Sequence, residues 1–237
     1  MLERIGARES DLRCGCHPPS YYTHTSTSPQ PGARFSQLHH NCSGKHAGFL
    51  AFCRMHHQRL DGYLDLDSPL QRRVRANVER FAGSRELPMG IDGCSAPNYA
   101  MPLSALAHTF CRLAAGETPE LAALAYAMTR HPDLVSGTSR SDLMLMRFGG
   151  GDWVSKVGAD GVQAIGVRSR GIGIAIRVAD GNRRALHVAT LAALQQLGLL
   201  DDPTGTPLAP LDERVIVNYR GIPVGAVEPS FTLPRLA

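Results

Sequence analysis

Apolar side chains recur every three or four residues along several stretches of the chain, a spacing that predicts helices with one buried face. The clearest case begins at Ser68 and Pro69, a favourable helix start, continues with apolar residues at 70, 74, 78 and 81, and ends at Gly83. The same spacing predicts helices over 44–58, 103–113, 119–130 and 183–197, and a short helix ending at 148. Residues 2–12 are expected to be the second half of a further helix.

Short apolar runs separated by glycines predict strands in the last third of the chain. They cover 153–154, 161–167 and 171–178, as in an antiparallel meander, and two more candidates lie at 214–219 and 224–227. Residues 16–37 lack periodicity and carry several prolines, so we expect a loop there. These elements predict one domain over 1–237, of α/β (α+β) class, with helices packed on an antiparallel sheet.

Composition narrows the class of protein to a soluble globular one. Of the 237 residues 43% are hydrophobic and 19% charged, and the net charge is +4 with the basic residues scattered, which argues against nucleic-acid binding. There is no apolar run of about 18 residues and no signal peptide, so we expect neither membrane insertion nor export. We therefore predict a cytoplasmic protein whose six cysteines are reduced.

The stretch 38–50 gathers a thiol, a hydroxyl, an amine and three imidazoles directly before an apolar helical pattern. If Asn41 or Ser43 caps that helix, Cys42 lies near its N-terminus, where unpaired N–H groups and the macrodipole favour a thiolate. A thiolate serves as a nucleophile or as a metal ligand. The alternative is that Cys42 is a buried, inert thiol.

A second cysteine follows a short apolar run at 90–97, where Asp92 and Gly93 precede Cys94 and Pro97 blocks regular structure. This pattern predicts a cysteine on a tight turn at the end of a strand. Two thiolates suit a borderline cation such as Zn²⁺. Ligand chemistry leaves the third ligand open between His46 and Asp92.

Several separated motifs together resemble the L-asparaginase II family, the inducible rhizobial type. They are 41–46, 92–97 and 155–161, then positions 131–142, 217–221 and 224–225, all in the family's order. The resemblance implies a fold like that of serine β-lactamases and glutaminases, hydrolysis of L-asparagine to L-aspartate and ammonia, and a homodimer. It also implies that Cys42, Lys45 and Cys94 hold Zn²⁺, which leaves His46 and Asp92 beside the metal or the substrate.

Two basic residues in the second half of the chain are further site candidates. Lys156 resembles the lysine of the Lys-x-Gly strand motif that flanks the nucleophile and holds the substrate carboxylate in related folds. Arg140 lies in a polar stretch that a capped turn before the next helix explains, and its guanidinium otherwise has the geometry for pairing with a substrate carboxylate. We thus predict Lys156 and His46 as catalytic residues, and Asp92 and Arg140 as substrate-binding residues.

The serine nucleophile of the resembling family sits in a Ser-x-x-Lys motif, and the printed sequence has none. We therefore expect a partial family domain that lacks the N-terminal portion, which leaves catalysis by the chain as printed open. Cys42 and Lys45 do have the spacing of that motif, so a cysteine amidohydrolase is one alternative. A non-catalytic remnant that binds zinc or an amino acid is the other.

Overall fold

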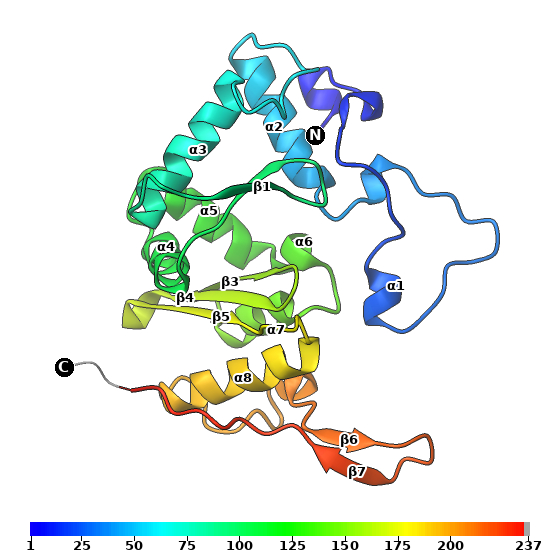
Figure 1. Cartoon of the computed structure of the whole chain (residues 1–237), viewed down its shortest axis with the longest axis vertical. Coiled ribbons are helices and arrows are strands. Elements are labelled where there is room, and N and C mark those ends of the chain that lie inside the picture. Colours follow the sequence, from blue (N-terminus) through cyan, green and yellow to red (C-terminus); the bar gives the residue numbers. More distant parts are fainter. Residues whose placement is uncertain (235–237) are drawn as a thin grey trace. The chain divides into compact units, whose positions relative to one another are not determined.

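The chain forms two compact units, Met1–Met101 and Pro102–Ala237 (Figure 1). The computed structural model describes residues 1–234. The single domain expected over 1–237 stays a prediction, because a division into compact units does not show whether either one folds by itself.

The first unit is built from helices and one short hairpin around its own core. Its regular elements are the helices α1 (Tyr21–His24), α2 (Ser43–Met55) and α3 (Pro69–Ala82), and the strands β1 (Met89–Ile91) and β2 (Pro97–Tyr99). Three 3₁₀ turns, Glu3–Ile5, Glu9–Asp11 and Gln37–His39, complete it. The core side chains come from all parts of the unit: Leu12, Cys14, Leu50, Cys53, Tyr63, Leu70, Cys94 and Ala96.

Helix α3 confirms its prediction in detail, since the Ser68 side chain accepts a hydrogen bond from the backbone of Gln71 and Gly83 ends the helix in a left-handed conformation. Helix α2 ends at Met55, three residues early, because His57 takes a positive φ of 52°. The helix expected over 2–12 is wrong. Two 3₁₀ turns stand there, interrupted by Gly6 at φ 64°.

The second unit contains the predicted meander and five helices among its described residues. The helices are α4 (Leu103–Ala115), α5 (Pro119–Arg130), α6 (Pro132–Ser136), α7 (Ser141–Phe148) and α8 (Arg183–Gln196). The strands are β3 (Trp153–Gly158), β4 (Val162–Val167), β5 (Ile172–Arg177), β6 (Val215–Val217) and β7 (Pro223–Ala226). Two 3₁₀ turns, Arg168–Arg170 and Ala209–Leu211, lie between them. Helix α6 was not predicted, and it starts at Pro132 directly after α5 ends.

Helices cover both faces of the antiparallel sheet β3-β4-β5 (Figure 1). On one face Ile165 and Ile174 pack with Leu145 of α7 and Leu191 of α8. On the other face Val154 packs with side chains of α4 and α5. Alternate strand residues therefore enter two separate cores, as the period of two requires. This arrangement confirms the α+β class with antiparallel sheets.

Helix α4 lies unusually close to the sheet. Gly166 and Gly173 are register partners on β4 and β5. A Cβ at Gly166 would lie 2.1 Å from the carbonyl oxygen of Phe110, and one at Gly173 would meet that of Ala107. The two glycines thus let the helix backbone rest on the strands. No described helix has both the length and the apolar character to cross a membrane.

Candidate functional site

Two thiols from distant parts of the sequence meet in the first unit. Cys42 occupies the N-cap position of α2, which corrects the expectation that Asn41 or Ser43 caps this helix. Cys94 lies in the turn between β1 and β2, as predicted, and is buried. One oxygen of Asp92 and the two sulfurs lie within 4.8 Å of one another.

The turn that carries Cys94 is held by its own backbone. The N–H of Asp92 donates to the carbonyl of Ala96, and the N–H of Ser95 donates to that of Asp92. Ser95 adopts a left-handed φ of 68°, a conformation that costs a non-glycine residue about 1 kcal/mol. Such strain persists only where the surroundings enforce it, so the turn fixes the direction of the Cys94 side chain.

Lys45 and Asp92 add opposite charges to the two thiols. The Lys45 Nζ donates to the Cys94 Sγ at 3.1 Å, and the Cys94 thiol donates to Asp92 Oδ2 at 3.3 Å. The ammonium and the same carboxylate oxygen are 3.6 Å apart. Cys42, Lys45, Asp92 and Cys94, hereafter the thiol cluster, thus form one connected polar group.

Burial and the charges within the thiol cluster together shift the pKa values of Cys42, Lys45 and Asp92. Burial raises the pKa of the Cys42 thiol, with the Lys45 charge opposing, so the lowered value expected from the helix N-terminus is wrong. Burial disfavours the Lys45 ammonium, but its contacts with Cys94, Cys42 and Asp92 outweigh this and raise its pKa. Burial also opposes ionisation of Asp92, but hydrogen bonds from Cys94 and Gly93 with the Lys45 charge lower its pKa. Without a metal, Lys45 is therefore the cation of the cluster.

The donor set of the thiol cluster fits a zinc ion. Two sulfurs and a carboxylate oxygen are ligand types that zinc accepts, and they already converge. Of the two candidates that ligand chemistry left open, the structure brings Asp92, and not His46, to the thiols. Lys45 must release its proton before it can bind a metal, which a cation beside two thiolates favours.

His46 follows Lys45 in α2 and lies in the core of the first unit. Its side chain is fully buried, its Nδ1 lies 2.5 Å from the hydroxyl of Tyr63, and that hydroxyl accepts the N–H of Arg13. Burial, then the charges of Lys45 and His40, lower the pKa of His46 to about 4. The ring is therefore neutral at pH 7, and within residues 1–234 its buried Nε2 has no hydrogen-bond partner.

Sequence reasoning missed Tyr63 and His40 as supports of this cluster. His40 accepts the backbone N–H of Cys42 at 2.9 Å and stacks edge-on against His17 at 4.4 Å. Tyr63 lies outside every motif, and nothing in its local sequence sets it apart. For His40 the available signal was the His39-His40 pair, which lies one residue before Cys42 in the sequence.

The second unit holds Lys156 at an edge strand. The Lys156 Nζ donates to the Val157 carbonyl at 2.7 Å and lies 3.5 Å from Asp142 Oδ2. Asp142 is fully buried and also accepts from Ser155 and Gln163. Sequence reasoning missed these last two, although Gln163 is the one polar residue of β4 and Ser155 directly precedes Lys156 in β3. These contacts fix the lysine at the outer edge of β3.

Comparison with known families decides the class of protein. A model of the L-asparaginase II family matches residues 1–229. The chain belongs to the L-asparaginase II family. The resemblance carried by the separated motifs is thereby confirmed. A search of curated proteins found no match.

Arg140 stands at the N-cap position of α7 in this L-asparaginase II-family chain. Its side chain is half-buried, and in the described part of the chain its guanidinium makes no hydrogen bond or ion pair. The backbone carbonyl of Arg140 accepts from Leu143, so the capped-turn interpretation explains the backbone, while the guanidinium is available to a ligand.

The lysine content of this L-asparaginase II-family chain is a signal that sequence reasoning overlooked. Among 25 lysines and arginines, Lys45 and Lys156 are the only lysines. Arginine stays charged under all ordinary conditions, whereas an amine can lose its proton, bind a metal or move a proton. Both lysines of the chain are therefore among the residues that the sequence predicted for the site.

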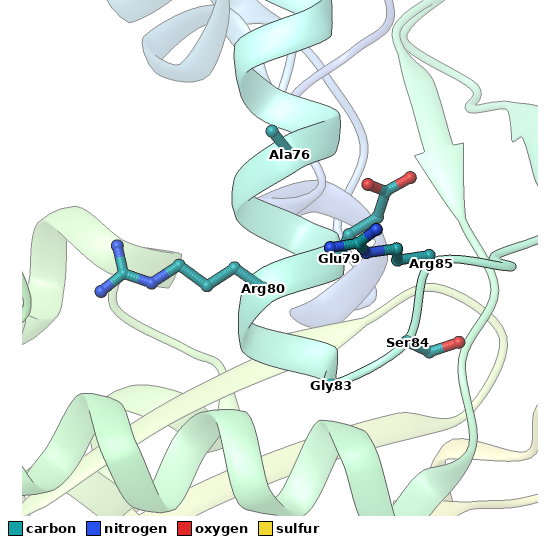
Figure 2. A pocket seen from close by; sticks show the side chains of 6 residues that line it. All are labelled: Ala76, Glu79, Arg80, Gly83, Ser84 and Arg85. Carbon is teal, nitrogen blue, oxygen red and sulfur yellow. The ribbon is translucent and has the colours of Figure 1, made fainter.

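A surface groove elsewhere in the first unit has no part in these groups. Figure 2 shows its lining residues at the C-terminal end of α3: Ala76, Glu79, Arg80, Gly83, Ser84 and Arg85. The volume of the groove is about 590 Å³. None of the predicted site residues lines it, and the Glu79 carboxylate is already paired with Arg75.

Proposed function

We propose that this chain is an L-asparaginase-type amidohydrolase, which converts L-asparagine and water to L-aspartate and ammonia. The observation that carries the proposal is the convergence of Cys42, Asp92 and Cys94 with Lys45 in a chain of this family. The two cysteines are 52 positions apart, 94 minus 42, and only a folded arrangement unites them.

In this proposal Cys42, Lys45 and Cys94 hold a zinc ion. When bound, the ion would act as a Lewis acid that polarises an oxygen of the substrate or of water. Asp92 lies at the same place and either binds the ion or accepts a hydrogen bond from the substrate. His46 is buried, so we assign it to holding Tyr63 and the start of α2 in place rather than to carrying protons in solution.

Lys156 and Arg140 are the proposed partners of the substrate carboxylate. Both belong to the second unit, and both present a cationic group that is at least partly accessible. Two cations suit an amino-acid substrate, whose α-carboxylate is fully charged at neutral pH. Asparagine, glutamine and other short amides share this feature, and we assign asparagine because of the family.

The nucleophile is the open part of the mechanism. Neither Lys45 nor Lys156 has a serine three residues before it. The cysteine alternative needs Lys45 to activate Cys42, but the hydrogen bond of the amine goes to Cys94. This contact favours the metal role for the thiol cluster over a cysteine nucleophile.

The test is to measure zinc content and ammonia release from L-asparagine on the same preparations of the full chain. Cys42→Ala and Cys94→Ala are expected to lose the bound zinc, and Cys16→Ala, which removes an exposed thiol outside the cluster, is expected to keep it. If Cys42→Ala and Cys94→Ala lose ammonia release together with the zinc, the result supports a zinc-dependent amidohydrolase. Zinc without ammonia release would favour the second candidate, a non-catalytic zinc- or amino-acid-binding protein, and zinc retained in both variants would refute the metal site.

We also propose a cytoplasmic location. Its support is that all six cysteines, each within the described residues, are free thiols, as a reducing compartment keeps them.

A further inference from the structure

The buried carboxylate of Asp142 is the least expected charge in the second unit. It is the second residue of α7 and is fully buried. A buried carboxylate is costly unless hydrogen bonds and an opposite charge compensate it. The hydrogen-bond donors and the cation around Asp142 must therefore compensate its charge.

Three neutral donors surround this carboxylate. Ser155 Oγ donates to Oδ1 at 2.8 Å and Gln163 Nε2 at 3.0 Å, while the backbone N–H of Val157 donates to Oδ2 at 3.0 Å. Gln163 also donates to Ser155 at 2.8 Å and accepts from Ser141 at 3.0 Å. The sheet builds this arrangement, since Gln163 on β4 is the register partner of Val157 on β3.

Lys156 supplies the only positive charge that the described residues bring to Asp142. Its Nζ lies 3.5 Å from Oδ2, and it also donates to the Val157 carbonyl at 2.7 Å. Both backbone groups of Val157 are therefore hydrogen-bonded by this pair, since its N–H donates to Asp142 and its carbonyl accepts from Lys156. The Asp142 carboxylate and the Lys156 ammonium are thus both anchored to the backbone of Val157 in the edge strand β3.

The Lys156 amine is held but not enclosed. Its side chain is 43% exposed, whereas that of its carboxylate partner is 0% exposed. An ammonium has three N–H donors, and the contacts with Asp142 and Val157 use two of them. One donor remains for a ligand, in a direction set by the other two.

We propose that Asp142 is a positioning residue, which fixes the Lys156 ammonium at the edge of β3 so that its remaining donor faces an anionic group of the substrate. The inference rests on the proposed function for the substrate alone, because the contact between the two side chains does not depend on any activity. Ser155, Gln163 and the Val157 N–H hold the carboxylate, and the carboxylate holds the lysine.

The test compares the acylation rates of Lys156 and Lys45 with an amine-reactive ester, followed by peptide mass spectrometry. The two lysines are the only ones in the chain, so Lys45 is the internal reference. In Asp142→Asn we expect the rate at Lys156 relative to Lys45 to rise about two- to fivefold, the size expected for a half-exposed ion pair. Asp152→Asn removes a carboxylate of the same unit that contacts Ser169 and Arg168 and not Lys156, and it is expected to keep the wild-type ratio.

An unchanged ratio in a folded Asp142→Asn protein would overturn the proposal. So would an equal rise in Asp152→Asn, because the effect would then follow from the loss of any carboxylate of the second unit and not of the one that contacts Lys156. If Asp142→Asn does not fold, the unmodified chain provides the test, since Lys156 should react several-fold more slowly in the native state than in urea, and equal rates would refute the positioning. None of these rates requires asparagine hydrolysis, so failure of the proposed function would be recognised separately, by absent ammonia release.

Discussion

At the residue scale, the thiol cluster shows how charges compensate one another before any metal is present. Lys45 has a raised pKa and Asp92 a lowered one, and the two face each other across the Cys94 sulfur. A zinc ion would replace the ammonium as the positive charge between the thiols. In the proposed metal-bound state the neutral Lys45 amine would bind the ion, and without the ion the Lys45 ammonium is the positive charge beside Cys94.

His46 makes the stability of the chain depend on pH. The folded state lowers the pKa of His46 from 6.5 to about 4. Between these two pH values the unfolded chain binds a proton at His46, whereas the folded chain keeps the ring neutral. The free energy of unfolding therefore falls as the pH drops from about 6.5 towards 4. The contribution of this one residue between pH 7 and pH 5 is about 2 kcal/mol.

The measurement is urea unfolding of chelator-treated protein at pH 7 and pH 5. His46→Gln is expected to be less stable at pH 7 but to lose about 2 kcal/mol less than the wild type on going to pH 5. His108→Gln, which removes an exposed histidine of α4, should keep the wild-type difference. An identical pH difference in all three proteins would show that His46 does not titrate in this way.

At the element scale, the position of α4 depends on two glycines of the sheet. A Cβ at Gly173 would overlap the carbonyl carbon of Ala107 at 2.6 Å, and one at Gly166 would lie 2.8 Å from the Ala114 side chain. Neither contact can be relieved by turning a flexible side chain, because the backbone of α4 is part of each collision. The helix and the strands must move apart if either glycine is replaced.

Gly173→Ala is therefore expected to lower the free energy of unfolding by about 3 kcal/mol or more, at the upper end of the cost of overpacking. Gly48→Ala is the matched control, since Gly48 lies exposed in α2 with open space around its would-be Cβ. It should stabilise the chain by about 0.5–1 kcal/mol through helix propensity. Chemical denaturation measures both, and equal effects of the same sign would contradict the close packing.

At the scale of the whole molecule, the hairpin of β6 and β7 stands out by its exposed apolar side chains. Val215, Val217 and Val224 are each more than half exposed, and the hairpin forms a sheet of only two strands. Isolated two-stranded sheets are marginally stable, and their unpaired edges invite another strand. We propose that a second copy of the chain pairs here, in keeping with the homodimer that the family resemblance implies.

Light scattering is expected to give twice the mass of one chain. Val217→Lys should shift the protein towards the monomer, because it places a charge on the exposed strand. Thr204→Lys, at an exposed position outside the hairpin, should leave the mass unchanged. A wild-type monomer at high concentration would refute the dimer, and a Val217→Lys dimer would exclude the hairpin as its interface.

The sequence by itself determined the elements and the family of this protein. Ser68 with Pro69, the glycine-separated strands and the ordered motifs are local signals, and each acts through neighbouring residues. Local signals failed where a single backbone angle decides the outcome, as at Gly6 and His57, whose positive φ values end helical structure early.

Only the tertiary structure decided which side chains meet. It brought Asp92 to the thiols instead of His46, and it paired Lys156 of β3 with Asp142 by packing α7 against that strand. It also showed that burial raises the pKa of Cys42, against the expectation from its place at a helix start. The physical reason is that pairing and desolvation depend on distances between remote residues, which are set when the core packs and not by the order of residues along the chain.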